Sequence, residues 1–156
     1  MLTLISPAKT FSSKAKHAER FPASSPRFLE EAHEIVGASL SLSQEELGRM
    51  LSLSPKLSKE VYHTQRTFFD DGVKELQAPL NYSGMVYRKL SAGTLSAEEW
   101  AYAEDHLRMT SFVYGLLRPS DLIRPYRMEG TAHIPGIGEG RIFDFWRDRL
   151  TPLFIE

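Results

Sequence analysis

Hydrophobic residues recur at three- and four-residue spacing in several stretches of the chain, a pattern typical of helices packed against a core. Residues 28–39 show this spacing after Pro26 and are predicted to form a helix. Ser43 and Glu46 fit a capping box, which predicts the start of a second helix. Pro55 suits the first turn of a third helix, so we expect two short helices joined by a tight turn.

Two longer helices are predicted in the second half of the chain. Ser96 and Glu99 form another capping-box pattern, and the helix that they open is expected to end near Gly115. Residues 140–154 carry apolar side chains on one face and predict a final helix. The glycines and prolines between these two helices indicate loops.

Strand candidates are fewer than helix candidates. Residues 2–5 predict a short buried strand, residues 11–27 a polar loop, and residues 79–90 an extended segment that contains a glycine. With about five helices and two or three strands, the expected fold class is α/β, in its helix-rich mixed form. A final helix normally crosses over to another strand. We therefore expect the sheet to be incomplete.

The composition is that of one soluble globular domain over residues 1–156. Of the 156 residues, 42% are hydrophobic and 25% are charged. No apolar run reaches the roughly 18 residues that a membrane-spanning helix needs, so no membrane partner is predicted. The chain has no cysteine, which excludes disulfides, zinc-thiolate sites and iron–sulfur clusters. Without an export signal, the expected location is the cytoplasm.

Charge is distributed unevenly, although the net charge is only −1. Residues 1–29 carry a net charge of +4, and residues 106–127 contain four arginines and one acidic residue. These two stretches would form a basic patch if they meet in space; the alternative is charge scattered over a solvated surface. The five histidines are not at metal-ligand spacing, and the sequence contains no GxSxG elbow or phosphate-binding P-loop. We therefore predict no metal ligands and no cofactor.

Lys9 is the first candidate functional residue. It lies just past the strand predicted at residues 2–5, where α/β folds place groups that contact ligands. Its ammonium group would contact a phosphate as a point charge, or act as a nucleophile or base if it is desolvated. The alternative is a solvated loop lysine.

The second candidate is the stretch MTSFVYGLLRPSDLIRPYR, which resembles a helix-hairpin-helix unit. Such units bind duplex phosphates through backbone N–H groups without reading the sequence. Leu117 stands where the usual hairpin has a second glycine, and the alternative is that Gly115 simply caps a helix that Pro119 stops. The arginines that would supply the cationic rim are Arg118, Arg124 and Arg127.

A third candidate is the sequence Pro-Gly-Ile-Gly at residues 135–138, which is closer to the usual hairpin. The segment before it contains Pro125 and Gly130, which disfavour the first helix of such a unit. We therefore favour a tight loop that leads into the last helix.

Three segments of the chain, LISPAKT, GMVYRKL and HLRMTSFVYGLLRPSDLIRPYRMEG, resemble the YaaA family of peroxide-stress proteins. The resemblance runs from residue 1 to about residue 150 with collinear spacing. It implies a YaaA-like α/β fold with a helix-hairpin-helix element, in a cytoplasmic bacterial protein of the hydrogen peroxide response. It also implies a role in iron homeostasis, in which limiting free iron protects DNA from Fenton chemistry, and binding of double-stranded DNA in a basic cleft.

The resemblance leads to three functional hypotheses. In the first, the protein binds duplex DNA backbone. The residues that we expect to contact the DNA are Lys9, Arg108, Gly115, Arg118, Arg124 and Arg127. In the second, the protein is an enzyme that acts on a nucleobase, nucleotide or damaged DNA, with Lys9 as nucleophile or acid/base and Asp121 assisting. In the third, carboxylates sequester iron directly.

The chain departs from the family in its length, because it lacks the C-terminal third of the family pattern. That third would supply further strands and another basic segment. Neither the catalytic residues nor the oligomeric state is indicated by the sequence.

Overall fold

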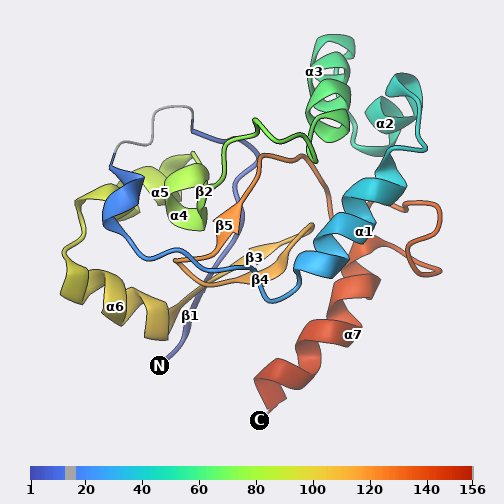
Figure 1. The fold of residues 1–156 in the computed structure, drawn as a ribbon. Coiled ribbons are helices and arrows are strands. Elements are labelled where there is room, and N and C mark those ends of the chain that lie inside the picture. Colours follow the sequence, from blue (N-terminus) through green and yellow to red (C-terminus); the bar gives the residue numbers. More distant parts are fainter. Residues whose placement is uncertain (13–16, 156) are drawn as a thin grey trace.

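A small sheet of three strands lies at the centre of the computed structural model, which describes residues 1–12 and 17–155 (Figure 1). Its strand order is β1 (Thr3–Ile5), β3 (Leu107–Ser111) and β4 (Gly115–Leu117). β1 runs parallel to β3, with Leu4 opposite Arg108, and β4 pairs antiparallel with β3. Residues more than 100 positions apart in the sequence thus form the central pairing.

A second, two-stranded sheet joins β2 (Leu76–Gln77) to β5 (Leu122–Ile123) in antiparallel register. Seven α-helices surround the two sheets in the described part of the chain. They are α1 (Leu29–Ser39), α2 (Gln44–Met50), α3 (Pro55–Arg66), α4 (Ala78–Asn81), α5 (Met85–Leu90), α6 (Ala97–His106) and α7 (Ile142–Ile155). Two 3-10 turns, η1 (Ala18–Arg20) and η2 (Ala92–Thr94), complete the elements.

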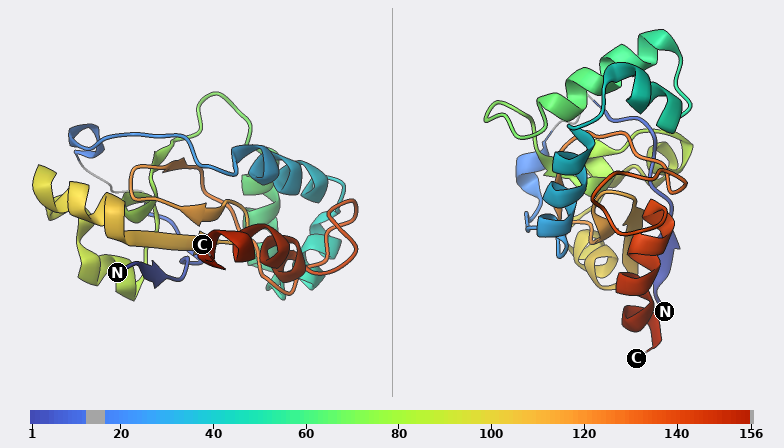
Figure 2. Two further views of the ribbon diagram at one scale, coloured as in Figure 1. Left: turned by 90° about the horizontal axis from the view of Figure 1, so that it is seen from below. Right: turned by 90° about the vertical axis from the view of Figure 1, so that its right-hand side faces the viewer.

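The helices lie in two groups on either side of the central sheet (Figures 1 and 2). The group with α1, α2, α3 and α7 packs over the main hydrophobic core, which includes Ile35, Met109 and Trp146. The group with α4, α5 and α6 covers a smaller core, in which Phe21 stacks on Trp100 with ring centroids 4.2 Å apart. Ala78 of α4 and Tyr87 of α5 also belong to the main core. Both termini lie at the lower side of Figure 1.

The helix starts predicted from the sequence are confirmed. Ser43 and Ser96 each accept a hydrogen bond from the backbone of the residue three positions on, and both complete a capping box. Ser54 caps α3, which has Pro55 in its first turn. These local signals need no tertiary partner, which explains why they could be read directly.

Two structural predictions are wrong, and a third is confirmed only in part. Residues 79–90 are not extended but largely helical, and Gly84 precedes α5 with a φ of +120° that favours glycine. The helix opened by Ser96 ends at His106 instead of near Gly115. The strand at residues 2–5 is present but lies at the edge of its sheet, with Leu2 and Leu4 45% and 49% exposed.

The predicted helix-hairpin-helix element is also not found, because β3, β4 and β5 occupy the residues assigned to it. Met109 and Ser111 are buried while Arg108 and Thr110 are less so, which is the two-residue period of a strand. Parallel pairing with β1 stabilises this strand, and sequence spacing near residue 107 does not reveal that pairing. The Pro-Gly-Ile-Gly stretch is a tight turn before α7, as favoured.

The helix-rich mixed α/β class is therefore confirmed. Among the described helices, none combines the length and the apolar character needed to cross a membrane.

Candidate functional site

A cavity of about 520 Å³ opens at the carboxyl ends of the parallel strands β1 and β3. Five segments line it, namely residues 6–9 after β1, residues 110–112 at the end of β3, Gly115 of β4, residues 126–129, and one face of α7. We call this cavity the β1–β3 cleft. Ligands of α/β proteins commonly bind at the carboxyl ends of parallel strands, and the volume is in the range of small-molecule sites.

Three charged residues meet at the rim of the β1–β3 cleft. The ammonium nitrogen of Lys9 lies 3.4 Å from Glu129 Oε1, and Nε of Arg127 lies 3.8 Å from the same oxygen. Arg127 also donates a hydrogen bond of 3.5 Å to the carbonyl oxygen of Lys9. We call these residues the rim cluster. Two cations that share one carboxylate leave this group with excess positive charge.

The three members of the rim cluster differ in exposure. The side chain of Lys9 is 68% exposed, whereas those of Arg127 and Glu129 are 17% and 24% exposed. Nε of Arg127 is buried and makes no hydrogen bond within the described structure. A buried N–H donor without an acceptor costs free energy, and the carboxylate oxygen paired with it, Glu129 Oε1, lies 3.8 Å away, beyond hydrogen-bond distance.

Buried hydroxyl groups form the inner end of the cleft. Tyr126 Oη lies 2.5 Å from Tyr82 Oη and 2.7 Å from Ser111 Oγ. Ser111 Oγ already accepts hydrogen bonds from the backbone N–H groups of Val113 and Tyr114, so its own hydrogen is directed to Tyr126. Burial raises the pKa of Tyr126 to about 12. The phenol is therefore neutral at physiological pH and is held by its neighbours.

Apolar side chains form the walls. The ring of Trp146 is fixed by a hydrogen bond of 2.8 Å from its Nε1 to the carbonyl oxygen of Phe112. Gly115 lies directly against this ring, since a Cβ at this position would be 2.4 Å from Trp146 Cζ3. Its φ of +74° also favours glycine. Gly115 is thus required for packing of the wall, not for capping a helix.

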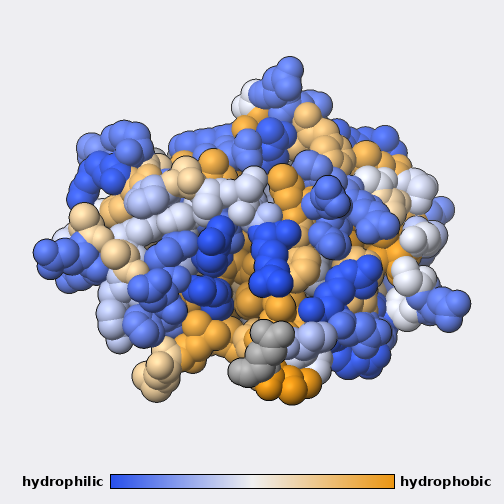
Figure 3. Space-filling model, turned by 60° about the horizontal axis from the view of Figure 1, so that its bottom comes forward, coloured by the Kyte–Doolittle hydropathy of each residue, from blue (hydrophilic) through white to orange (hydrophobic). Residues whose placement is uncertain are grey.

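Figure 3 turns forward the side that carries both termini in Figure 1. Hydrophobic residues, in orange, lie there between strongly hydrophilic ones, in blue (Figure 3). Several large apolar side chains of β1 and α7 are exposed, among them Leu4, Phe143 and Phe154.

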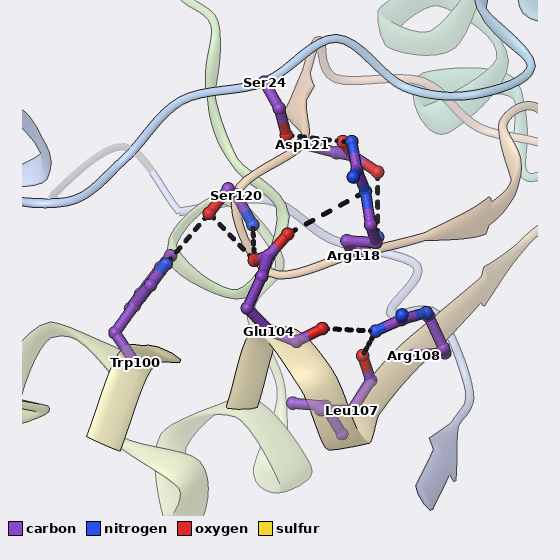
Figure 4. A network of polar contacts seen from close by, with 8 residues as sticks. All are labelled: Ser24, Trp100, Glu104, Leu107, Arg108, Arg118, Ser120 and Asp121. Atoms are coloured by element: carbon purple, nitrogen blue, oxygen red, sulfur yellow. Dashed lines mark hydrogen bonds and ion pairs between the residues drawn. The ribbon is translucent and has the colours of Figure 1, made fainter. Parts of the chain in front are cut away.

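Arg118 lies outside the cleft, in a polar network shown in Figure 4. Its Nη2 lies 3.2 Å from Asp121 Oδ1, and its Nε lies 3.8 Å from Glu104 Oε1. Asp121 is 1% exposed and also accepts hydrogen bonds from Ser24 Oγ and the backbone N–H of Arg118. Glu104 in turn accepts hydrogen bonds from the hydroxyl and backbone N–H of Ser120.

The Asp121 network is therefore structural. Asp121 does not line the β1–β3 cleft, at whose rim Lys9 lies, so the structure does not bring these two residues together there. Arg108 borders the same network, and its Nη1 donates to the carbonyl oxygens of Glu104 and Leu107 (Figure 4).

Arg124 is likewise held by the fold. Its Nη1 donates hydrogen bonds of 2.6 and 2.9 Å to the carbonyl oxygens of Phe68 and Asp70, and its Nη2 lies 3.4 Å from Glu75 Oε1. The guanidinium group thus closes the loop between α3 and β2. Of the six residues predicted to contact DNA, only Lys9, Gly115 and Arg127 line the cleft.

The sequence did not single out Glu129, Tyr126 or Trp146. The RMEG sequence could have indicated an ion pair for Glu129, because this acidic residue lies two positions after Arg127 in a loop. In the described part of the chain, no three side chains of His, Asp or Glu come together as candidate metal ligands, so no carboxylate iron site is found there.

Comparison with known proteins places the chain among bacterial relatives. All of residues 1–156 match a family model described as peroxide stress protein YaaA. A UPF0246 protein of Porphyromonas gingivalis is 44% identical over 156 residues, covering 100% of this chain and 61% of that protein. A UPF0246 protein of Bacteroides thetaiotaomicron is 45% identical over 157 residues, covering 100% and 60% respectively.

A more distant UPF0246 protein, from Cellvibrio japonicus, is 34% identical over 155 residues, covering 97% of this chain and 59% of that protein. The chain therefore spans about 60% of the length of the curated relatives that it matches.

Proposed function

The chain belongs to the peroxide stress protein YaaA family, and on this premise we propose that it binds double-stranded DNA through the β1–β3 cleft and limits Fenton damage by free iron. We further propose that residues 1–156 act as one domain, corresponding to the N-terminal two thirds of a longer pattern. Because the proposed partner is DNA, the proposed location is the cytoplasm.

One observation carries the DNA hypothesis. Lys9 and Arg127 are 118 positions apart in the sequence, yet both point to Glu129 at the rim of one cleft. Lysine supplies a point charge and arginine a planar fork, a combination suited to phosphate oxygens. Ion pairs of exposed side chains contribute only about 0–1 kcal/mol, so a phosphate can displace the contact between Lys9 and Glu129.

The proposed interface is narrower than the sequence suggested. Arg118 and Arg124 are occupied by carboxylates and carbonyl oxygens of the protein itself. Recruiting Arg118 to a DNA phosphate would break its contacts with Asp121 and Glu104, and recruiting Arg124 would break its hydrogen bonds to Phe68 and Asp70. We therefore assign phosphate binding to Lys9 and Arg127, and assign Arg108, Arg118 and Arg124 to the fold.

A binding measurement at two salt concentrations tests this proposal. Fluorescence anisotropy of a labelled duplex should show affinity that falls as salt rises, because phosphate contacts release counterions. Lys9→Gln and Arg127→Gln should each weaken binding about tenfold at low salt. Lys59→Gln removes an exposed charge from α3 and is the matched control. Equal binding by all four proteins would refute the assignment.

The limitation of iron damage is proposed to follow from this binding. DNA covered by the protein is shielded from radicals formed at loosely bound iron. A hydroxyl-radical cleavage assay with iron and hydrogen peroxide checks this: the wild-type protein should reduce cleavage of duplex DNA, and Lys9→Gln should reduce it less. An equal reduction of cleavage by both proteins would show that protection from iron damage does not depend on the β1–β3 cleft.

The enzyme hypothesis is the second candidate, and the position of the cleft at the strand ends favours it. Nucleophilic lysines are usually desolvated, whereas the side chain of Lys9 is 68% exposed. Borohydride reduction in the presence of DNA with an abasic site tests it. A covalent adduct at Lys9 would favour the enzyme, and its absence would favour binding alone.

A further inference from the structure

We infer that the β1–β3 cleft holds a single nucleotide unit, with the phosphate at the rim cluster and the base against the apolar walls. This inference rests on the proposed function, because it names the part of DNA that enters the cleft. The same chemistry also occurs in a free nucleoside monophosphate, and the experiment below distinguishes the two sources.

The shape of the site is the first reason. A protein that only follows the backbone of a duplex needs an exposed row of cations, not a cavity. The β1–β3 cleft encloses about 520 Å³ and extends inward from the rim cluster to Tyr126. This is a volume typical of sites for small ligands.

The charge of the rim is the second reason. Lys9, Arg127 and Glu129 together carry one excess positive charge. Arg147 also lines the cleft, but Asp144 and Asp148 pair with its guanidinium group. The charge that remains unpaired matches one phosphate group rather than a run of phosphates. Nε of Arg127 is buried without a hydrogen-bond acceptor. A phosphate oxygen that displaces the Glu129 carboxylate from between Lys9 and Arg127 would supply that acceptor.

The walls are the third reason. Behind the rim, the cleft is lined by the aromatic side chains of Phe112, Phe143 and Trp146. Phe143 is 46% exposed, and the ring of Phe112 meets its ring edge-on with centroids 5.2 Å apart. Apolar and aromatic surfaces bind bases of any sequence, because every base has a flat π-face.

The inner hydroxyl groups add a prediction about selectivity. Tyr126 is already bonded to Tyr82 and Ser111, and it stays neutral because burial raises its pKa to about 12. A side chain committed to its neighbours contributes little to discrimination between bases. We therefore expect adenine and thymine nucleotides to bind with affinities within about threefold of each other.

Isothermal titration calorimetry of the whole 156-residue chain tests the inference. The probes are AMP, adenosine and inorganic phosphate, followed by a single-stranded tetranucleotide and a duplex. AMP should bind at least about tenfold more tightly than adenosine or phosphate alone, since each of these lacks one half of the contacts. AMP that binds no better than either fragment would overturn the inference.

Variants assign the effect to the rim cluster. Lys9→Gln and Arg127→Gln should weaken AMP binding about tenfold, and Lys59→Gln should leave it unchanged. Glu129→Gln removes the competing carboxylate and should strengthen AMP binding about threefold. This gain keeps the test decisive if Arg127→Gln does not fold, and weaker binding by Glu129→Gln would contradict the inference.

The outcomes also separate this inference from the proposed function. Duplex binding that depends on Lys9 without AMP binding would support the DNA interface and refute the nucleotide pocket. AMP binding without duplex or tetranucleotide binding would support the pocket and assign it to a free nucleotide. Tetranucleotide binding that AMP displaces would identify a nucleotide within a strand as the ligand.

Discussion

Two groups of charged side chains in this molecule both combine arginine with carboxylates, but they differ in how deeply the carboxylates are buried. In the network around Asp121, the carboxylate is 1% exposed and accepts hydrogen bonds of 2.7 and 2.8 Å from Ser24 and from the Arg118 backbone. In the rim cluster, Glu129 is 24% exposed and lies 3.4 and 3.8 Å from Lys9 and Arg127. The first group is closed by the fold, whereas the second is open to a ligand.

This difference shows why counting arginines misleads. Arg118, Arg124 and Arg127 lie within ten residues of one another in the sequence, and only Arg127 lines the cleft. A guanidinium group whose N–H groups all donate to acceptors of the protein stabilises the fold. A guanidinium group with an N–H that has no acceptor is better suited to bind a ligand. Changes at the two groups should therefore separate stability from binding.

The largest expected effect is at Asp121. Asp121→Ala should lower the free energy of unfolding by about 3 kcal/mol, because Ser24 and the Arg118 backbone lose a buried charged acceptor. Urea denaturation followed by circular dichroism measures this. Glu129→Ala, the matched truncation in the rim cluster, should alter stability by less than about 0.5 kcal/mol. Equal losses would remove the distinction between the two groups.

Gly115→Ala should have the next largest effect, a loss of about 2 kcal/mol. The new Cβ would be 2.4 Å from Trp146 Cζ3, at a φ of +74°. The wall of the cleft would shift, so AMP affinity should fall together with the melting temperature. Gly37→Ala, on α1 where the new Cβ would meet no atom within 4 Å outside its own stretch of helix, is the control and should be neutral or slightly stabilising. A fully stable Gly115→Ala protein would contradict the packing described here.

How far the sequence could predict the molecule depends on the distance over which each signal acts. The helix caps at Ser43 and Ser96 act over three residues, and the structure confirms the helix starts that they predict. The strand at 107–111 depends on pairing with Thr3–Ile5, and the spacing of its apolar residues suited a helix as well. Tertiary pairing decided between the two.

The same limit applies to the site. The position of Lys9 after β1 predicted a ligand-contacting residue, and the cleft is found there. The contacts of Arg124 to Phe68 and Asp70 bridge more than 50 residues, so no local pattern revealed that this arginine is occupied. Glu129 was overlooked because its partner Lys9 is 120 positions away in the sequence.

The buried tyrosines predict how stability depends on pH. Burial raises the pKa of Tyr126 to about 12 and that of Tyr82 well above its usual range. The folded protein therefore keeps protons that the unfolded chain loses above pH 10. Their contribution is complete below pH about 10 and decreases above it, by about 1.4 kcal/mol per pH unit for each tyrosine.

Urea titrations between pH 8 and 11.5, with phenolate absorbance recorded in parallel, measure this dependence. Tyr126→Phe should reduce the slope above pH 10. A slope equal to that of the wild-type protein would show that Tyr126 ionises as easily in the folded state as in the unfolded one.

The smallest expected effect on stability is at Lys9. The side chain is 68% exposed, so Lys9→Gln should change the free energy of unfolding by less than about 0.5 kcal/mol. Thermal denaturation is sufficient to check this. A larger loss would mean that the ion pair with Glu129 supports the fold, as the Asp121 network does.

The central claim is that the cations of the rim cluster bind phosphate and those of the Asp121 network do not. The most direct test is the affinity for a labelled duplex of two variants at one low salt concentration, Lys9→Gln/Arg127→Gln and Arg118→Gln, each checked for folding by circular dichroism. We expect the first to lose at least about tenfold in affinity and the second to stay within about twofold of the wild-type protein. A folded Arg118→Gln protein that loses as much affinity as the double variant would contradict the account.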